Sequence, residues 1–362
     1  RPDRPDDPFL PKQYWLENVG QADDKGRTGF PRCDLRAFEA WKQYKPKQEI
    51  VLAIIDSGLD LTHEDIDPSC LWTNPGESGT DAEGRDKASN GVDDDGNGYI
   101  DDVHGWNFMR NSPDVQEDQY HGTHVGGLLV ARSDNGTGIA GAYPGLKVML
   151  VKVFGLGNYL SSEKFAEAIR YAANNGAKVL SNSYGTPSYT QAMHDAVRHC
   201  LSKGALFVCA SGNSRKNMDL EDDRDYPSCF GVENQLVVGA TNNRDFSTFS
   251  NYGSMVEIAA PGEAIFSLMP KSTYRSFSGT SQACPLVAGA ACWVWAMNPQ
   301  FSWRDVKARL LDSADQIAGL GLWVRGGLRL NLANALAGKP GKRLSVEDFS
   351  RWHEETRLIE TT

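Results

Sequence analysis

Three short stretches of the sequence contain the residue types needed for nucleophilic catalysis. Asp56 ends the apolar run in IIDSG, His121 opens HGTHVGG, and Ser281 lies in SGTSQACPLVAG. A serine hydroxyl is a weak nucleophile at neutral pH and needs a base to take its proton. An imidazole is such a base when a carboxylate fixes its tautomer and stabilises its charged form. The three stretches therefore indicate a site for acyl transfer.

Each of these residues also has a simpler interpretation. An aspartate directly after an apolar strand commonly caps the next turn, and a serine at the start of an apolar helix is most often an N-cap. His121 and His124 are three residues apart and could share one helical face as metal ligands. No acidic ligand follows within a turn, so HExxH metalloprotease chemistry is excluded. Ser281 lies in GTSQA rather than GxSxG, which argues against a lipase or esterase.

Taken together, AIIDSGLD, HGTHVGG and SGTSQACPLVAG resemble the three signature blocks of the subtilisin-like serine endopeptidases, in that family's order of Asp, His and Ser. A fourth block, CASGN, resembles the segment that carries the family's oxyanion asparagine, here Asn213. The resemblance covers roughly residues 49–338 and includes calcium-loop-containing members from parasitic protozoa and some bacteria. It implies that Asp56, His121, Asn213 and Ser281 are catalytic and that His124 is structural.

The resemblance also implies where a peptide substrate binds. The peptide would lie as an extended strand between two edges, and glycines there would let the two backbones approach closely. Asp225 at the floor of the first specificity pocket would favour Lys or Arg at the cleaved residue. The alternative is that Asp225 is one more solvated charge in the acidic run 219–225. The implied edges and pocket walls are Gly155, Leu156 and Gly157; Ser183, Tyr184 and Gly185; and Ala210, Ser211 and Gly212.

The run DDDGNGYIDD at 93–102 resembles an EF-hand calcium loop. Asp93, Asp95 and Asn97 fall at positions one, three and five, Gly98 at six, and the carbonyl of Tyr99 at seven. Carboxylates this dense repel one another unless a cation neutralises them. The alternative is a disordered acidic loop.

This run departs from the calcium-loop pattern at its end. Position twelve is His104 instead of glutamate, so Asp101 or Asp102 must complete the coordination shell. A second calcium site is implied by the family resemblance alone, and its loop ARSDNGTGIAG is longer than expected. The ligands implied for it are Asp65, Asp134, the carbonyls near Arg132 and Ile139, and either Asp7 or Gln13.

Strands and helices that alternate along the chain must position these residues. Apolar β-branched runs predict strands at 49–58, 146–154, 177–183, 205–210, 235–241 and 256–262. Helices are predicted at 161–176, 189–202, 281–297 and 302–314, the first with Ser161 or Ser162 as N-cap and Gly176 just past its end. This alternation predicts an α/β fold, and the resemblance implies the three-layer subtilisin-like form with a mostly parallel central sheet.

The same patterns divide the chain. Residues 1–48 are predicted to form an N-terminal extension that packs on a catalytic domain at 49–338, and residues 339–362 a tail. An insert at about 67–119, rich in Gly, Asp and Asn, is predicted to be loops with little core. Its EF-hand-like run and the second site make Ca²⁺ the expected cofactor, with two or more sites.

Composition excludes some classes of protein. The 362 residues carry a net charge of −10, which argues against nucleic-acid binding. The apolar run 283–297 is too short to span a bilayer. The first residue is Arg1 and no signal sequence is present, so either a signal and pro-segment were removed or the chain is trimmed. We expect a protein secreted or held in a secretory compartment, made as a zymogen with an inhibitory pro-segment.

The seven cysteines contain no CxxC pair, so zinc-ribbon and thioredoxin interpretations are excluded. Cys209, Cys284 and Cys292 lie in apolar runs and are predicted to be buried small hydrophobes. The remaining four have more polar neighbours and are predicted to form up to two disulfides; they are Cys33, Cys70, Cys200 and Cys229.

The sequence therefore predicts a secreted, calcium-dependent serine endopeptidase that cleaves extended protein or peptide substrates. Two alternatives stay open. One is a peptide ligase or cyclase of the same fold, which would use identical residues. The other is a catalytically dead, calcium-dependent binding scaffold, against which the intact set of catalytic residue types argues.

Overall fold

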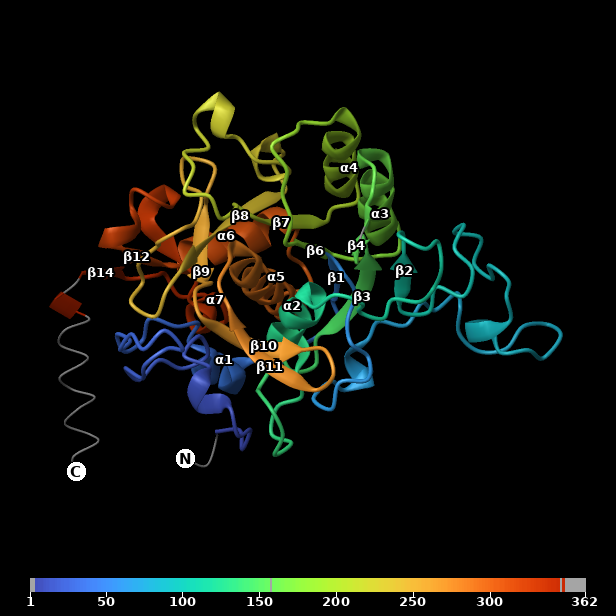
Figure 1. Cartoon of the computed structure of the whole chain (residues 1–362), viewed down its shortest axis with the longest axis horizontal. Helices are drawn as coiled ribbons and strands as arrows, with labels where there is room; N and C mark the ends of the chain where they lie inside the picture. Colours follow the sequence, from blue (N-terminus) through green and yellow to red (C-terminus); the bar gives the residue numbers. More distant parts are fainter. Residues whose placement is uncertain (1–3, 157, 346, 349–362) are drawn as a thin grey trace.

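The computed structural model describes residues 4–156, 158–345 and 347–348 of the chain. Its centre is a ten-stranded sheet with the strand order β14-β12-β13-β9-β8-β7-β6-β1-β3-β2 (Figure 1). From β2 to β13 neighbouring strands are parallel, and β12 pairs antiparallel with β13. The strands are β1 (Val51–Asp56), β2 (Gly105–Asn107), β3 (Lys147–Lys152), β6 (Val179–Asn182), β7 (Leu206–Ala210), β8 (Gln235–Thr241), β9 (Ile258–Pro261), β12 (Asp315–Ile317), β13 (Leu328–Arg329) and β14 (Arg343–Leu344).

Helices cover both faces of this sheet. Each face has its own hydrophobic core: α3 and α4 share one, and α1, α2, α5, α6 and α7 share the other (Figure 1). The helices are α1 (Ala37–Gln43), α2 (His121–Val130), α3 (Ser162–Asn174), α4 (Gln191–Ser202), α5 (Thr280–Met297), α6 (Trp303–Ser313) and α7 (Leu332–Ala337). The predicted α/β fold with a mostly parallel central sheet is confirmed.

Strand β1 is buried on both faces of the sheet, and this explains why its sequence has no polar face. Leu52 and Ile54 pack into the core shared with α2 and α5, whereas Ala53 and Ile55 pack into the core shared with α3 and α4. Successive side chains of a strand point to opposite faces, so a strand covered on both faces must be apolar throughout. In register, Ile54 lies beside Leu150 of β3 and Ser181 of β6, which places β1 in the interior of the sheet.

Two short antiparallel hairpins lie outside the central sheet. One joins β4 (Phe154–Gly155) to β5 (Asn158–Tyr159), and the other joins β10 (Ile265–Met269) to β11 (Thr273–Phe277). The sequence patterns predicted neither hairpin. Short 3-10 helices are formed by Leu10–Lys12, Pro68–Cys70, Lys87–Ser89, Glu221–Asp223, Ser228–Phe230, Ala318–Leu320 and Arg325–Gly327.

The prediction that 67–119 holds little core is wrong for its two ends. Trp72, Trp106 and Phe108 are buried in the core shared with α3 and α4, and β2 forms the edge of the sheet beside β3. Strand β2 has the sequence Gly-Trp-Asn, which is too short for alternation and contains no β-branched residue. The middle of the insert projects from the β2 end of the sheet, in cyan (Figure 1).

The prediction of disulfides is also wrong. All seven cysteines are unpaired. Cys33 and Cys200 are fully buried despite their polar sequence neighbours. Cys200 is buried because it lies on the inward face of the amphipathic helix α4. Within the described residues, no helix combines the length and apolarity that a membrane crossing requires.

Candidate active site

The parallel sheet collects the predicted residues at one edge. Asp56 is the last residue of β1, Ser183 follows β6, and Ser211, Gly212 and Asn213 follow β7. Strands β1, β6 and β7 are neighbours, and the carboxyl ends of parallel strands share one edge, where ligands of open α/β sheets bind. Residues from three distant parts of the chain are thereby brought together.

His121 begins α2 and faces Asp56. Its Nδ1 lies 2.8 Å from Asp56 Oδ1 and 3.0 Å from Oδ2. The Asp56 side chain is 1% exposed, and its Oδ1 also accepts a hydrogen bond of 2.8 Å from the amide of Ser57. Helix α2 reaches this strand because its second residue is glycine: a Cβ on Gly122 would lie 2.0 Å from the carbonyl oxygen of Gly58.

Electrostatics favour a protonatable ring at His121. Burial lowers the pKa of His121, but the charge and hydrogen bond of Asp56, together with the charge of Glu117, outweigh burial and leave this pKa above its usual value. In His124, by contrast, burial lowers the pKa to about 3, and its ring lies 3.0 Å from the carbonyl oxygen of Arg275 and 3.3 Å from the Gln282 amide. His124 is therefore a neutral, buried side chain. The two histidines belong to no metal-ligating cluster among the described residues.

Ser281 lies in the first turn of α5, after the N-cap Gly279. Its hydroxyl donates to the carbonyl oxygen of Ser183 at 3.2 Å, and the Ser183 hydroxyl donates back to the Ser281 carbonyl oxygen at 2.9 Å. The next residue, Gln282, contacts the His124 ring one turn below His121. The first turns of α2 and α5 are thus adjacent.

Asn213 contributes an oriented amide beside Ser281. Its Oδ1 accepts hydrogen bonds from the backbone N–H of Thr280 at 2.8 Å and from the Thr280 hydroxyl at 3.0 Å. The orientation of Nδ2 is thereby set: a Cβ on Gly279 would lie 3.5 Å from Asn213 Nδ2 and 3.6 Å from the Ser281 backbone nitrogen. Asn213 Nδ2 and the Ser281 backbone nitrogen therefore lie near one point beside Gly279, at a helix N-terminus that favours negative charge; the acceptor Gln282 Oε1 lies 2.7 Å from the same point.

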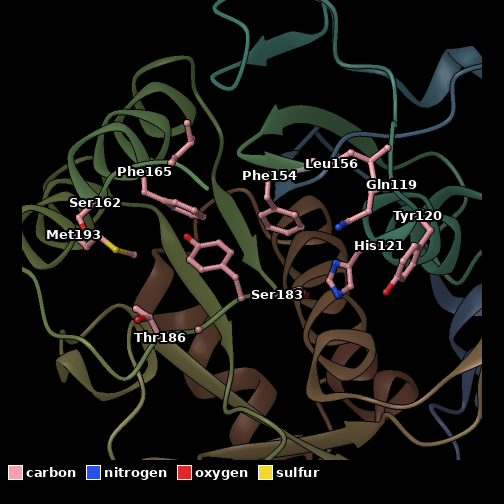
Figure 2. Close-up of a pocket in the computed structure, with 14 residues that line it drawn as sticks. Gln119, Tyr120, His121, Phe154, Leu156, Ser162, Phe165, Ser183, Thr186 and Met193 are labelled. Carbon is pink, nitrogen blue, oxygen red and sulfur yellow. The ribbon is translucent and has the colours of Figure 1, made fainter. Parts of the chain in front are cut away.

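A pocket of about 670 Å³ opens beside His121 (Figure 2). Phe154 and Phe165 project into it, and His121 and Ser183 lie at one end. Five of the predicted substrate residues line it: Gly155, Leu156, Ser183, Tyr184 and Gly185. Ala210, Ser211, Gly212 and Asp225 are not part of its lining. Gly157 lies outside the described residues.

Asp225 lies against both predicted pocket walls. A Cβ on Gly185 would be 2.8 Å from Asp225 Oδ1, and a Cβ on Gly212 would be 2.9 Å from Oδ2. The carboxylate is half-buried and accepts a hydrogen bond from the amide of Tyr226. Burial raises the pKa of Asp225, and the positive charge of Lys216 opposes this rise. Asp225 is thus set apart from the exposed side chains of its acidic run.

The structure groups the calcium-loop residues differently from the sequence pattern. Carboxylate oxygens of Asp93, Asp95 and Glu77 lie within 4.8 Å of one another. Sequence reasoning missed Glu77, because it precedes the loop and no ligand spacing identifies it. Glu77 is fully buried, its Oε1 accepts from the amide of Asp94 at 2.8 Å, and its Oε2 is buried without a hydrogen-bond partner. An unpartnered buried carboxylate oxygen beside two more carboxylates fits a cation.

Two other carboxylates predicted for this loop, Asp101 and Asp102, bind groups outside the cluster of Glu77, Asp93 and Asp95. Asp101 accepts a hydrogen bond from the amide of Gly91. Asp102 is buried and accepts hydrogen bonds from the side chains of Asn74, Asn97 and Tyr171. The hydroxyl of Tyr99 donates to Glu167 at 3.1 Å. Asp101 and Asp102 therefore lie outside the group that Glu77 completes.

The second predicted calcium site is only partly assembled. Asp65 is fully buried and accepts from the amide of Ile139 and the side chain of Asn135, each at 2.9 Å, and burial raises its pKa to about 7. Asp7 accepts from the amide of Asp134 at 2.9 Å, and its Oδ1 is buried without a hydrogen-bond partner.

Two further side chains predicted for this site are Gln13 and Asp134. Gln13 makes two hydrogen bonds with the backbone of Ala140, of 2.7 and 2.9 Å, and Asp134 is exposed. The amide of Arg132 donates to the Asp65 carbonyl oxygen at 2.8 Å.

Comparisons with known proteins identify the family of this chain. The subtilase family model matches residues 47–338. A thermophilic serine proteinase of Bacillus sp. (strain AK1) is 31% identical over 82% of this chain, which spans 64% of that protein. Thermitase of Thermoactinomyces vulgaris is 37% identical over 65% of this chain and 81% of its own length. Subtilisin-like protease 1 of Plasmodium vivax is 29% identical over 84% of this chain and 50% of its own length.

A solved structure of a protease from Pseudoalteromonas arctica PAMC 21717 shares the fold. It superposes with a TM-score of 0.69 at 22% identity, covering 92% of this chain and 99% of its own. The family model alone covers well over half of the chain. The chain therefore belongs to the subtilase family of subtilisin-like serine endopeptidases.

Proposed function

We propose that this chain hydrolyses peptide bonds by acyl transfer through Asp56, His121 and Ser281. The contact of 2.8 Å between His121 and a buried Asp56, at the edge that also carries Ser281, is the observation that carries the proposal. His121 Nε2 takes the proton of Ser281 as its oxygen attacks the peptide carbonyl, and Asp56 stabilises the resulting imidazolium. His121 then protonates the leaving amine, and water repeats the steps to release the acyl group.

Asn213 and the backbone N–H of Ser281 hold the oxyanion of the tetrahedral intermediate. Both donors flank the space beside Gly279, and preorganised donors of this kind need no reorientation as charge develops. In this proposal the Ser281 hydroxyl first leaves the Ser183 carbonyl oxygen and turns toward His121 by rotation about its Cα–Cβ bond.

The substrate is a protein or peptide bound as an extended strand between residues 155–157 and 183–185. Backbone hydrogen bonds supply affinity in this binding mode, and side-chain pockets supply specificity. In this proposal Asp225 favours Lys or Arg at the cleaved residue, which its position against Gly185 and Gly212 and its half-buried negative charge support. Secretion and an inhibitory pro-segment complete the proposal.

Calcium is the proposed cofactor, with a stabilising rather than a chemical role. Glu77, Asp93 and Asp95 hold one ion, and Asp7 and Asp65 with the loop 132–139 hold another. A bound cation neutralises carboxylates that would otherwise repel one another.

A fluorophosphonate probe tests the catalytic assignment. The wild type should be labelled and should cleave a peptide library; Ser281→Ala should do neither, and Ser202→Ala, at an exposed serine of α4, should do both. Absence of labelling in the wild type would indicate a binding scaffold. Accumulation of ligated or cyclic products when an amine nucleophile is added would indicate a ligase.

The same library tests Asp225. Wild-type cleavage should favour Lys and Arg, Asp225→Ala should lose this preference, and Asp222→Ala, at an exposed position of the same acidic run, should retain it. A wild type indifferent to basic residues would remove Asp225 from the pocket.

A further inference from the structure

A second buried carboxylate lies behind the Asp56–His121 pair. Glu117, four residues before His121, is 8% exposed. Its Oε2 accepts from the Ser57 hydroxyl at 2.8 Å and from the amide of Thr123 at 3.1 Å. Its Oε1 accepts from the amides of Gln119 at 2.8 Å and Asp118 at 3.1 Å. All of these donors belong to the segments that carry the catalytic aspartate and histidine.

Glu117 and Ser57 together cap the helix that begins with His121. The N-cap residue Tyr120 makes no side-chain capping bond. Instead, the amide of Gly122 donates to Ser57 Oγ at 2.8 Å, and the amide of Thr123 donates to Glu117. The first N–H groups of a helix need such acceptors, and a carboxylate there also interacts favourably with the helix dipole. Glu117 and Ser57 therefore help to fix the orientation of the first turn of α2.

The charge state of Glu117 also decides where the Ser57 proton points. Ser57 Oγ is 2.8 Å from Glu117 Oε2 and 3.3 Å from Asp56 Oδ1. An ionised Glu117 accepts the hydrogen bond of the Ser57 hydroxyl. The Asp56 carboxylate is then free to accept from the imidazole of His121. A neutral side chain that donates to Ser57 would instead turn the hydroxyl proton toward Asp56, where it competes with His121.

Glu117 also places a second negative charge near His121. The charged groups around it are Asp56 at the end of β1, His121 on α2, and Asp118, which pairs with Lys152 of β3 at 2.9 Å and with Arg110 at 3.3 Å. Burial raises the pKa of Glu117, hydrogen bonds from Gln119 and Ser57 oppose this rise, and the charge of Asp56 adds to it. Burial lowers the pKa of His121, and the charges of Asp56 and, more weakly, Glu117 raise it.

We infer that Glu117 is a positioning residue for the proposed acyl transfer: it holds Ser57 and the first turn of α2 so that Asp56 faces His121, and its charge supports the imidazolium. This inference rests on the proposed function of His121 as general base. It predicts an effect on the protonation of the base, which a purely structural cap would not produce.

The test is the pH profile of kcat and kcat/KM on a chromogenic peptide, in calcium, for three variants. Glu117→Gln removes the charge, and Glu117→Asp keeps it on a shorter side chain. Glu257→Gln is the matched control, because Glu257 is 8% exposed like Glu117. Glu257 pairs with Lys307 at 2.9 Å and lies before the amino end of β9. Urea unfolding of each variant measures stability separately.

Glu117→Gln should lower the plateau kcat about tenfold and leave KM within about twofold, because the lost charge acts on the imidazolium of the transition state. Removing a charge that raises the pKa of His121 lowers that pKa, so the acid limb of kcat/KM should move to lower pH. Glu117→Asp should keep the wild-type acid limb, and Glu257→Gln should keep both the limb and kcat.

An unshifted acid limb with wild-type kcat in Glu117→Gln would overturn the inference, whatever happens to the urea midpoint. If Glu117→Gln does not fold, Ser57→Ala tests the same connection between Glu117 and Asp56. An unchanged kcat and an unchanged acid limb in Ser57→Ala would also overturn the inference. Failure of the proposed function would look different, because the wild type would then be inactive or Ser281→Ala would keep its activity.

Discussion

At the scale of single residues, the chemistry depends on which atom of a side chain is already bound. Asn213 has a carboxamide oxygen and a carboxamide nitrogen, and only the nitrogen can stabilise an oxyanion. Thr280 binds the oxygen twice, through its amide and its hydroxyl. The nitrogen is therefore directed at the space beside Ser281, and the carboxamide orientation is fixed before substrate arrives.

Replacing Asn213 with alanine should lower kcat about 100- to 1,000-fold, the cost of removing one oxyanion donor from a subtilisin. KM should change little, because the donor acts on charge that exists only in the transition state. Steady-state kinetics on a peptide amide measure both. Asn213→Asp is the control, because it keeps an acceptor for Thr280 while removing the donor, and it should be equally slow. A kcat of Asn213→Ala within threefold of wild type would contradict the assignment of Asn213.

At the scale of elements, the geometry of the site depends on how closely α2 approaches β1. Two glycines on α2 face the chain that follows β1, and they differ in what they touch. A Cβ at Gly122 would meet the Gly58 backbone carbonyl oxygen at 2.0 Å, whereas a Cβ at Gly126 would meet the tip of the Leu59 side chain at 2.8 Å. The Gly58 backbone cannot make room for a Cβ unless the end of β1 moves. The Leu59 side chain can make room by rotating.

Gly122→Ala should therefore lower the free energy of unfolding by about 3 kcal/mol and displace His121 from Asp56, with loss of activity. Gly126→Ala should stay within about 1 kcal/mol of wild type, since the helix propensity gained offsets the crowding. Urea unfolding and peptide hydrolysis measure the two effects. Equal destabilisation by both substitutions would show that the approach to Gly58 does not limit the packing of α2.

At the scale of the whole molecule, we expect buried carboxylates without hydrogen-bond partners to make stability depend on calcium. The oxygens Glu77 Oε2 and Asp7 Oδ1 are both buried without hydrogen-bond partners, and they lie in different surface segments. Burying a charge without compensation costs free energy, and a bound cation removes that cost. A ligand that binds only the folded state stabilises it by about 2.7 kcal/mol at 100 times its Kd.

Calcium should raise the melting temperature of the wild type, and a chelator should reverse the change. Glu77→Gln should reduce the calcium-dependent part of this rise. In chelator it should melt at or above the wild-type temperature, because it removes an unpartnered buried charge. Glu83→Gln, at an exposed position of the same insert, should behave as wild type. Scanning calorimetry with and without calcium measures this, and an unchanged calcium effect in Glu77→Gln would remove Glu77 as a ligand.

Local sequence patterns were enough to predict most of the central elements. The apolar run before Asp56 became β1, QLVVGAT became β8, and Ser161 caps α3 with Gly176 just beyond its end at positive φ. These features depend on side-chain periodicity and on backbone preferences of neighbouring residues, which a sequence displays directly. The prediction of Asp56, His121, Asn213 and Ser281 as site residues also came from residue type and order, and the structure places Asp56 beside His121 and Asn213 beside the start of α5.

The sequence by itself thus predicted which residues carry the proposed chemistry, and it determined most of the strands and helices that position them. Only the tertiary structure decided that Thr280 orients Asn213, that Glu77 joins Asp93 and Asp95, that Glu117 lies behind Asp56 through Ser57, and that no cysteine is paired. The physical reason is that these contacts join segments far apart in the chain. Their partners are chosen by how the sheet and helices pack, and no local periodicity records that choice.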